Sequence, residues 1–383
     1  MIRVGHVVVA GELGGAEHML RDLSRPRGNT PEPEPEPEPA LHHVTEPEPA
    51  LHHVVCVLSP TDALPQFFRD AGIHVRDGGR IHETPLSALG RAFGSRALDW
   101  LAGVLREERV GIVHLHTFGS QVLGTRAARA LGARIVRTEH STRVYDDPSC
   151  WPFSRWSLAR TDVVVAISAH VRDAALARAP WIADHVRVVP NGVDLSTFAP
   201  RDVAKADTFT FALVGRLEPR KGVDIALRAL ASIGMVNGPR LEIVGDGAEL
   251  PRLRALTREL GLSDRVTFHG YLDDPRPVLA RAHAALASSR KEGLGIAFLE
   301  SMAMSLPLVA VPVGGLVEIV QPAVTGLLSR SCDHRALGEA MTELACDRDR
   351  AAALGVAARA FVEQRYSLDA MRAGYRAVYA SLS

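Results

Sequence analysis

The chain has 383 residues, a length that exceeds one ordinary hydrophobic core and predicts two domains. Its 44 lysines and arginines balance its 44 aspartates and glutamates, which excludes the global positive charge that would attract nucleic acid or an anionic membrane. The four cysteines form no CxxC pair and no metal-type spacing with histidine, so we expect a reduced, cytoplasmic protein.

Residues 1–10 form an apolar run that is too short to span a bilayer and lacks a signal-peptide cleavage pattern, which favours a buried parallel strand. Gly14 and Gly15 follow, in the turn before a helix expected at residues 16–24. Paired glycines at such a turn let the backbone approach a ligand closely. A plain tight turn explains them equally well, and the GxGxxG spacing of a dinucleotide site is absent.

Residues 25–53 interrupt this pattern with a proline–glutamate alternation, in which the sequence EPEPALHHV at 36–44 recurs at 46–54. Proline and like charge favour an extended, solvated segment, so we interpret 25–53 as a disordered insertion between the first helix and the second strand. The insertion contains four paired histidines, namely His42, His43, His52 and His53. They offer metal ligands, but a duplication copies histidines as readily as any residue, and we expect no metal.

Apolar strands then alternate with amphipathic helices. Strands are expected at 54–58, 111–115, 133–138 and 162–167, and helices at 64–70, 86–107 and 121–131. This alternation predicts a parallel sheet with helices on both faces, in which ligands bind at the carboxyl ends of the strands.

Polar residues follow three of these strands in succession. His116, on the same strand face as His114, ends one strand, His140 follows the next, and Ser168 follows a third, where it also suits a helix N-cap. Each residue alone has an ordinary structural explanation. Three strand ends that finish in histidine or serine indicate a ligand site.

A turn at residues 190–194 and an irregular polar stretch at 195–207 predict the domain boundary. Strands are expected again at 210–214, 240–244, 266–268 and 284–287, with helices at 223–232, 249–260 and 277–280. We therefore predict an α/β protein with two Rossmann-like, doubly wound parallel-sheet domains facing a cleft, residues 1–194 and 195–365.

The second domain opens with a strand that ends at Gly215 and a loop that carries Arg216 and Lys221. Two fixed cations beside backbone amides can neutralise a diphosphate leaving group without a metal, and the spacing is not that of a Walker A loop. His269, Gly270 and Tyr271 end a later strand, where they either approach a nucleotide base or form a simple turn.

Glu292 and Glu300 flank a glycine-bearing turn that enters a helix. Backbone amides at a helix start favour anions or hydroxyls, and carboxylates accept hydrogen bonds from vicinal diols, so the pair suits a sugar or a ribose. The alternative is a charged surface loop before an ordinary helix. The turn between the two carboxylates consists of Gly293, Leu294, Gly295 and Ile296.

Several of these motifs occur together in one order: Asn191-Gly192-Val193-Asp194, the Gly-Arg and Lys-Gly of 215–222, Glu-x7-Glu, and Gly314-Gly315. This combination resembles the retaining, nucleotide-sugar-dependent glycosyltransferases of family 4, which have the two-domain type B fold. The resemblance covers nearly the whole chain apart from the insertion.

The resemblance implies roles for the matching residues. Arg216 and Lys221 would hold the donor diphosphate, Glu300 the ribose, and Glu292, with the amides of the turn, the hydroxyls of the donor sugar. His116 would lie against the donor sugar, which makes His116, Arg216, Lys221 and Glu292 the catalytic candidates. Gly15 and the loop at His269, Gly270 and Tyr271 complete the donor side, whereas Gly14, His140 and Ser168 are assigned to the acceptor side. A C-terminal helix at 366–383 would complete the first domain.

The implied activity is transfer of a glycosyl group from a nucleoside diphosphate sugar of the UDP or GDP type to an acceptor hydroxyl, with retention and without a cofactor. The acceptor is a small molecule, a glycan or a lipid-linked sugar. An epimerase of the same fold, a phosphorylase, or a non-catalytic nucleotide-binding protein are the alternatives. A helix at 86–106 with apolar Leu89, Phe93, Trp100 and Leu101 either contacts a membrane surface or packs in the core. The sequence leaves the oligomeric state open.

Overall fold

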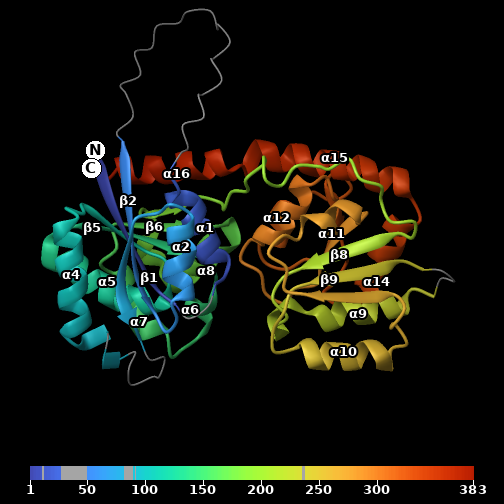
Figure 1. Ribbon diagram of the computed structural model, residues 1–383, viewed down its shortest axis with the longest axis horizontal. Helices are drawn as coiled ribbons and strands as arrows, with labels where there is room; N and C mark the ends of the chain where they lie inside the picture. The colour runs from blue at the N-terminus through green and yellow to red at the C-terminus, as the bar shows by residue number, and fades with distance from the viewer. Residues whose placement is uncertain (11–12, 27–49, 82–88, 91, 235–237) are drawn as a thin grey trace, which may run out of the picture. The chain divides into compact units, whose positions relative to one another are not determined.

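The computed structural model describes residues 1–10, 13–26, 50–81, 89–90, 92–234 and 238–383. The chain forms two compact units, one of residues 1–166, 174–189 and 372–383 and the other of residues 167–173 and 190–371. Each unit contains one parallel β-sheet with helices packed on it (Figure 1). The doubly wound α/β architecture of both halves is therefore confirmed.

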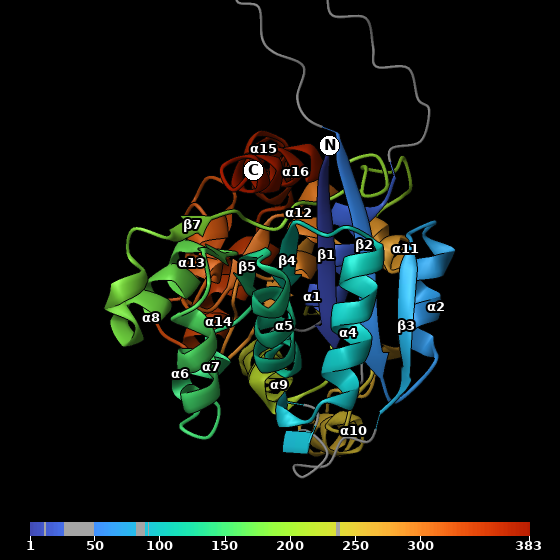
Figure 2. The ribbon, with the colours of Figure 1, turned by 90° about the vertical axis from the view of Figure 1, so that its left-hand side faces the viewer.

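The sheet of the first unit has seven strands in the order β3-β2-β1-β4-β5-β6-β7 (Figure 2). The strands are β1 (Ile2–Val9), β2 (Leu51–Ser59), β3 (Val75–Arg80), β4 (Ile112–Leu115), β5 (Arg134–Glu139), β6 (Val163–Ala166) and β7 (Val186–Val188). The helices are α1 (Gly15–Ser24), α2 (Ala63–Asp70), α4 (Arg96–Glu107), α5 (Phe118–Leu131), α6 (Arg143–Asp146), α7 (Trp151–Leu158), α8 (Ala169–Arg178) and η1 (Pro180–Ile182), with α8 beginning in the second unit.

Alternate residues of the central strands face two helical layers. Val7 and Val9 of β1 pack in a cluster with Leu101 of α4 and Leu123 of α5. Val8, between them, packs with apolar residues of α1 and α2. Since the side chains along a strand alternate between the two faces of the sheet, each strand places every second residue on the face that carries Val8.

The second unit has a six-stranded sheet in the order β10-β9-β8-β11-β12-β13. Its strands are β8 (Thr210–Val214), β9 (Arg240–Val244), β10 (Val266–Gly270), β11 (Ala284–Ala287), β12 (Leu308–Ala310) and β13 (Gly326–Leu328). Its helices are η2 (Pro219–Lys221), α9 (Val223–Ser232), α10 (Leu250–Glu259), α11 (Arg276–Arg281), α12 (Ile296–Ala303), α13 (Leu316–Ile319), α14 (His334–Ala345) and α15 (Arg348–Arg365), and α16 (Leu368–Ala380) ends in the first unit.

Two predicted segments differ from the structure. The expected insertion at 25–53 falls mostly outside the described residues, but its end was wrong, because β2 already begins at Leu51 and includes His52 and His53. The helix expected over 86–107 was wrong at its middle. The part described breaks at Gly94, where Arg126 Nη1 donates hydrogen bonds to the carbonyl oxygens of Ala92 and Gly94, 2.6 and 3.2 Å away.

The apolar residues of this segment have two different environments. Leu101 is fully buried and Trp100 packs partly buried against the core, whereas Leu89 and Phe93 are exposed. Among the described residues, no helix is both long and apolar enough to cross a membrane.

Candidate active site

The second sheet reverses its strand order between β8 and β11. The chain leaves β8 toward β9 on one side and leaves β11 toward β12 on the other, so the loops after β8 and β11 diverge at the position where doubly wound sheets bind their ligands. The first loop carries Arg216 and Lys221, and the second carries Glu292. The structure thus brings together three residues that the sequence predicts to act on the donor.

Lys221 and Glu292 form the closest pair of this site. Lys221 Nζ lies 2.6 Å from Glu292 Oε2, and their side chains are only 15% and 8% exposed. Ser289 Oγ donates to the same carboxylate oxygen at 3.1 Å, and Lys221 Nζ also lies 5.7 Å from the ring centre of Phe298. The pair therefore holds an ammonium group in place beside a carboxylate, both largely withdrawn from water.

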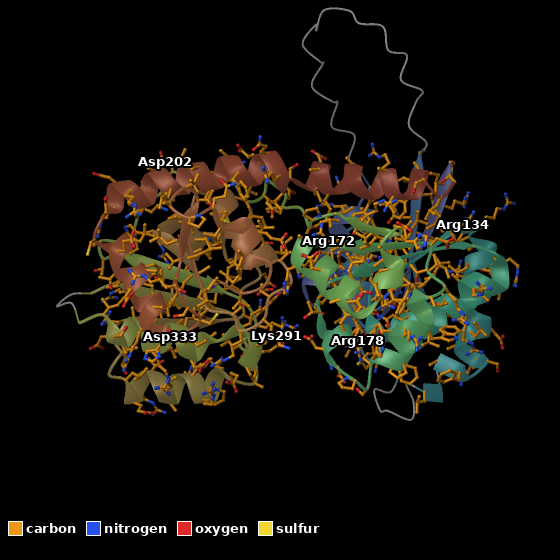
Figure 3. All side chains as sticks on the ribbon, turned by 180° about the vertical axis from the view of Figure 1, so that it is seen from behind. Arg134, Arg172, Arg178, Asp202, Lys291 and Asp333 are labelled. Atoms are coloured by element: carbon orange, nitrogen blue, oxygen red, sulfur yellow. The ribbon has the colours of Figure 1, made fainter. Side chains whose placement is uncertain are left out.

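Arg216 lies at the more open side of the β8 loop, with 43% of its side chain exposed and its Nε 3.1 Å from Glu218 Oε1. Arg220 Nε donates to the other oxygen of Glu218 at 2.6 Å. Burial opposes ionisation of Glu218, but the hydrogen bond from Arg220 and the charges of Arg220, Arg216 and Lys221 outweigh it and lower the pKa of this carboxyl. The loop therefore presents several cations that are fixed by one carboxylate. Lys291, which is not part of this loop, is also exposed on the surface (Figure 3).

Two glycines allow the loops of the site to approach one another. Gly222 has φ +61°, and a Cβ atom there would lie 2.1 Å from the carbonyl oxygen of Ser288. Gly314 has φ +56°, and a Cβ atom there would lie 2.1 Å from the carbonyl oxygen of Glu292. Since both positions combine left-handed backbone with a contact to another loop, only glycine fits them without displacing the site.

The turn from Gly293 to Ile296 leads into α12, with Gly295 at the N-cap in left-handed conformation. Glu300 lies one turn into this helix. The first amides of a helix have no partner within the helix, so they face whatever occupies the crevice. One loop therefore carries both a carboxylate and the start of a helix, as expected for a site that binds hydroxyl groups or an anion.

Ser168 belongs to the second unit and lies against this same turn. Its Oγ donates to the carbonyl oxygen of Gly293 at 2.7 Å and accepts from the amide of Val171 at 3.1 Å. Glu318 accepts the amides of Ala169 and of the next residue at 2.9 and 2.7 Å. Ser168 is thus an N-cap, as its position suggested, and it supports the donor-side turn.

The predicted base-side residues have different surroundings. His269 Nε2 lies 3.3 Å from Glu242 Oε2 on the neighbouring strand, so that imidazole is engaged within the sheet. The carbonyl of Gly270 accepts the amide of Gly245 at 2.7 Å. Tyr271 is 69% exposed, which leaves its ring available to a planar ligand.

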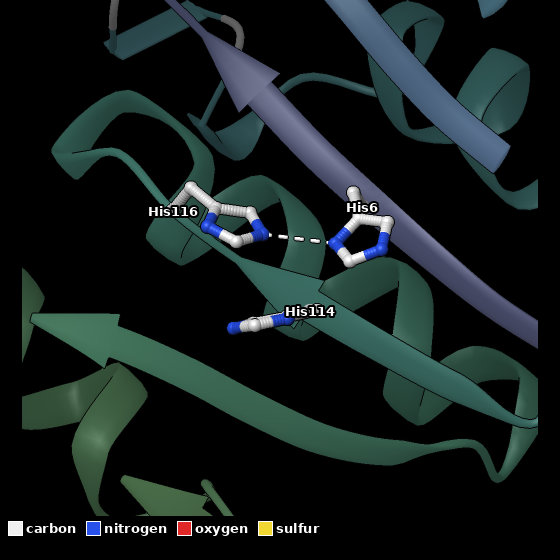
Figure 4. A group of neighbouring side chains, drawn as sticks. All are labelled: His6, His114 and His116. Carbon is white, nitrogen blue, oxygen red and sulfur yellow. Dashed lines mark hydrogen bonds between the residues drawn. The ribbon is translucent and has the colours of Figure 1, made fainter. Parts of the chain in front are cut away.

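In the first unit, His116 follows β4 at the corresponding reversal of strand order, between β1 and β4. The strand register places His6 of β1 beside His114, and both share a sheet face with His116 (Figure 4). His6 Nδ1 and His116 Nε2 are 2.9 Å apart, and His6 Nε2 and His53 Nδ1 are 2.8 Å apart. We call His6, His53, His114, His116 and His140 the histidine cluster.

His114 is held by two hydroxyl groups. Its Nδ1 lies 2.7 Å from the hydroxyl of Tyr379, and its Nε2 lies 2.7 Å from Thr138 Oγ1, which in turn lies 3.0 Å from the hydroxyl of Tyr375. Both tyrosines come from α16, whose residues 372–380 belong to the first unit. His140 follows β5, and its ring centre lies 5.8 Å from that of His116.

Burial governs the charge of the cluster. Desolvation lowers the pKa of His6, His114 and His116 well below the usual value, and lowers that of His53 and His140 to about 4. The rings are therefore neutral at physiological pH. Within the described ranges, the buried nitrogens His116 Nδ1 and His140 Nε2 have no hydrogen-bond partner, so both atoms are open to a ligand at this end of the sheet.

His6, His114 and His116 are also the one group of described residues whose ligand atoms gather as a metal site requires, within 4.8 Å of one another. A divalent cation there would need to break the bond between His6 and His116 and take a nitrogen of His114 from its hydroxyl partner. It would also lie among neutral imidazoles that are 0–5% exposed, with no carboxylate in the group to balance its charge. The geometry therefore favours a hydrogen-bonded network of these three histidines over a metal site.

The loop after β1 contains the glycine pair. Gly14 is the N-cap of α1, and its amide donates to Glu17 Oε2 at 2.9 Å, while Gly15 begins the helix. This arrangement caps α1. Sequence reasoning did not find His6, Tyr375 or Tyr379, and it placed His53 in the insertion. The sequence signal for His6 is that it lies, like His114, within an apolar run expected to form a strand.

Two doubly wound units, one of which carries Arg216, Lys221 and Glu292 at its strand-order reversal, form a framework suited to a ligand of the nucleotide type. Residues 49–197 match the model of Glycosyltransferase Family 4, and residues 197–361 match that of Glycosyl transferases group 1. The chain belongs to glycosyltransferase family 4, and it is a glycosyltransferase.

Named relatives agree with this assignment. The chain is 37% identical to the GDP-mannose-dependent alpha-(1-6)-phosphatidylinositol monomannoside mannosyltransferase of Mycobacterium tuberculosis, over 66% of this chain and 71% of the relative. It is 32% identical to the D-inositol 3-phosphate glycosyltransferase of Acidothermus cellulolyticus, over 59% of each chain. Anabaena HepE in complex with UDP and glucose shares the fold, with a TM-score of 0.81 at 20% identity over the full length of both chains. The epimerase alternative finds no support among them.

Proposed function

We propose that the enzyme transfers a hexosyl group from a nucleoside diphosphate sugar to an acceptor hydroxyl with retention of anomeric configuration. The observation that carries this proposal is the pair of Lys221 and Glu292 at the strand-order reversal of the second sheet, beside Arg216. An ammonium and a guanidinium balance a diphosphate, while the carboxylate and the start of α12 suit sugar hydroxyls.

In this proposal, Arg216 and Lys221 stabilise the negative charge that develops on the departing diphosphate. Glu300 binds the ribose, and Glu292 with the turn before α12 binds hydroxyls of the donor sugar. No metal or other cofactor is needed for these roles, because the chain supplies the cations itself.

Retention by two displacements would require a carboxylate nucleophile beside the anomeric carbon. The residues assigned to the first-unit side of the site include His116 and His140, which are imidazoles, and none of the residues assigned there is a carboxylate. Glu139 precedes His140 and therefore points to the opposite face of the sheet, where it pairs with Arg137. We therefore favour attack of the acceptor on the same face as the leaving group, with the leaving phosphate accepting the acceptor proton.

For the donor, we propose GDP-mannose. Three relatives that are 31–37% identical carry GDP-mannose in their names, whereas the UDP-bound structures of the same fold are 20–21% identical. For the acceptor, we propose an inositol-containing molecule, since relatives from both named groups act on inositol derivatives.

We also propose that the enzyme works in the reducing cytoplasm, since all four cysteines are unpaired. The exposed Leu89 and Phe93 of the first unit offer a surface for transient contact with a membrane that carries a lipid-linked acceptor. Binding to vesicles that requires both side chains would support this contact, and equal binding of a Leu89→Ser/Phe93→Ser variant would exclude it.

The test uses purified enzyme with GDP-mannose, UDP-glucose and UDP-N-acetylglucosamine, each offered with inositol phosphate, phosphatidylinositol mannoside and malate. Calorimetry gives nucleotide binding with and without magnesium, and NMR of the product gives the anomeric configuration. We expect transfer from GDP-mannose with retention and without metal. Inversion, or binding that depends on magnesium, would contradict the proposed chemistry; transfer from a UDP-sugar only would replace the donor.

A further inference from the structure

Three imidazole rings of the first unit form a continuous hydrogen-bonded line across the sheet. His53 on β2, His6 on β1 and His116 after β4 lie on adjacent strands and on one face. The contacts are His53 Nδ1 to His6 Nε2, at 2.8 Å, and His6 Nδ1 to His116 Nε2, at 2.9 Å. His116 Nδ1, at the end of the line, is buried and has no hydrogen-bond partner in the part of the chain that the structure describes.

The rings in this line are neutral, because burial outweighs every other influence on their pKa values. A neutral imidazole carries one N–H and one lone pair, so each ring can donate through one nitrogen only. His6 bonds through both nitrogens, and it must therefore donate to one neighbour and accept from the other.

This constraint leaves two arrangements of protons. In the first, His116 Nε2–H donates to His6 Nδ1, and His6 Nε2–H donates to His53 Nδ1, which makes every ring the Nε2–H tautomer. In the second, both bonds reverse and every ring is the Nδ1–H tautomer. The three tautomers are thus coupled, and the state of His53 determines which chemistry His116 Nδ1 presents.

Two considerations select the first arrangement. The Nε2–H form is the intrinsically preferred tautomer of a neutral histidine side chain, and this preference acts on all three rings at once. The second arrangement would also leave an N–H at His116 Nδ1 buried without an acceptor, and orphaned buried N–H groups are rarer in proteins than unsatisfied acceptors.

We infer that His6 and His53 are positioning residues that hold His116 as the Nε2–H tautomer, so that His116 Nδ1 accepts a hydrogen bond from a hydroxyl of a ligand bound at this end of the first sheet. The inference rests on the proposed function for the presence of that ligand, but the tautomer is a property of the free protein. The inference further predicts that a group on β2 controls a ring that follows β4, two strands away.

Histidine-specific nitrogen labelling and long-range nitrogen–proton NMR of the free protein test the inference directly, with the His116 signals assigned by their loss in His116→Gln. We expect a pyridine-like Nδ1 and a pyrrole-like Nε2 at His116. In His53→Phe, His6 Nε2 loses its partner, so each arrangement leaves one buried N–H unpaired, at His6 Nε2 or at His116 Nδ1. The difference that selects the wild-type arrangement is then lost, and a large share of the molecules should hold His116 in the Nδ1–H form. His53→Asn supplies an amide oxygen that accepts from His6 and should restore the wild-type pattern.

His18→Phe is the matched control, because His18 is another histidine of the first unit with a pKa lowered to about 4, and it lies outside the line. It should leave the His116 signals and kcat/KM unchanged. His53→Phe should lower kcat/KM for the donor about threefold to tenfold, which corresponds to one hydrogen bond to the substrate, and His53→Asn should recover it.

Three results would overturn the inference: a pyrrole-like Nδ1 at His116 in the wild type, a tautomer that His53→Phe does not change, or one equivalent of zinc in the purified protein. These results are distinct from failure of the proposed function, which would show as absent nucleotide binding or transfer in the wild type. GDP binding, which we assign to the second unit, and the melting temperature verify that each variant is folded.

Discussion

Replacement of Lys221 by methionine should remove most of the activity while the protein remains folded. Lys221 is the ammonium held 2.6 Å from Glu292 Oε2, and we assign it to the departing diphosphate. Loss of one preorganised group that stabilises transition-state charge costs about 100-fold to 1,000-fold in kcat, or about 2.7–4 kcal/mol. Steady-state rates of transfer from the donor sugar give kcat, and calorimetry gives the affinity for GDP.

The same change leaves Glu292 with Ser289 as its remaining described partner. Breaking a buried ion pair costs about 3–5 kcal/mol, and the partial exposure of this pair reduces the expected cost to about 1–3 kcal/mol. Lys221→Met/Glu292→Gln removes both charges and should regain stability without regaining activity. Lys205→Met, which changes an exposed lysine of the same unit whose Nζ donates to the carbonyl oxygen of Ala282, should keep wild-type activity. The reasoning fails if Lys221→Met turns over within threefold of the wild type.

Glu300→Gln should weaken GDP binding about tenfold in calorimetry, since a hydrogen bond to a charged group contributes about 1.5–3 kcal/mol; unchanged affinity would remove Glu300 from the ribose site. Gly314→Ala should abolish transfer, because the new Cβ atom would meet the carbonyl oxygen of Glu292. Gly261 also has positive φ but lies beside open space, so Gly261→Ala should cost only about 1 kcal/mol in stability. Equal activity of the two variants would contradict this reasoning. Below pH 6.5 the unfolded chain binds protons that buried His53 and His140, with pKa values of about 4, do not bind. The free energy of unfolding should therefore fall between pH 6.5 and 4, by at most about 1.4 kcal/mol per pH unit for each ring, and the melting temperature should fall with it; a flat profile would show that the pKa values of these rings are not lowered.

The donor loops were predictable because their residues are close in sequence to strand ends. Gly215, Arg216 and Lys221 follow one apolar run, and Glu292 follows another, so knowledge of a doubly wound sheet is enough to bring them to one edge. The helix that begins after Gly295 was likewise evident from its glycine turn.

The histidine cluster was not predictable to the same extent, because its contacts depend on strand order. His6 and His53 become neighbours of His116 only when β1 lies between β2 and β4, and the alternation within one strand does not reveal which strands adjoin. The edge strand β3 (Val75–Arg80) was missed for a different reason: its sequence VRDGGR is polar, and an edge strand needs few buried side chains.

The tyrosines of α16 have a consequence for biosynthesis. Tyr379 and Tyr375 supply hydroxyl partners of His114 and Thr138, so two buried polar groups of the first unit depend on residues that follow the second unit in the sequence. During translation, the strands of this unit leave the ribosome long before these partners exist, while the second unit is still to be made. Until α16 is made, His114 Nδ1 and Thr138 Oγ1 lack these hydroxyl partners. A chain that stops before α16 would carry every residue assigned here to the donor and still lack a finished first half.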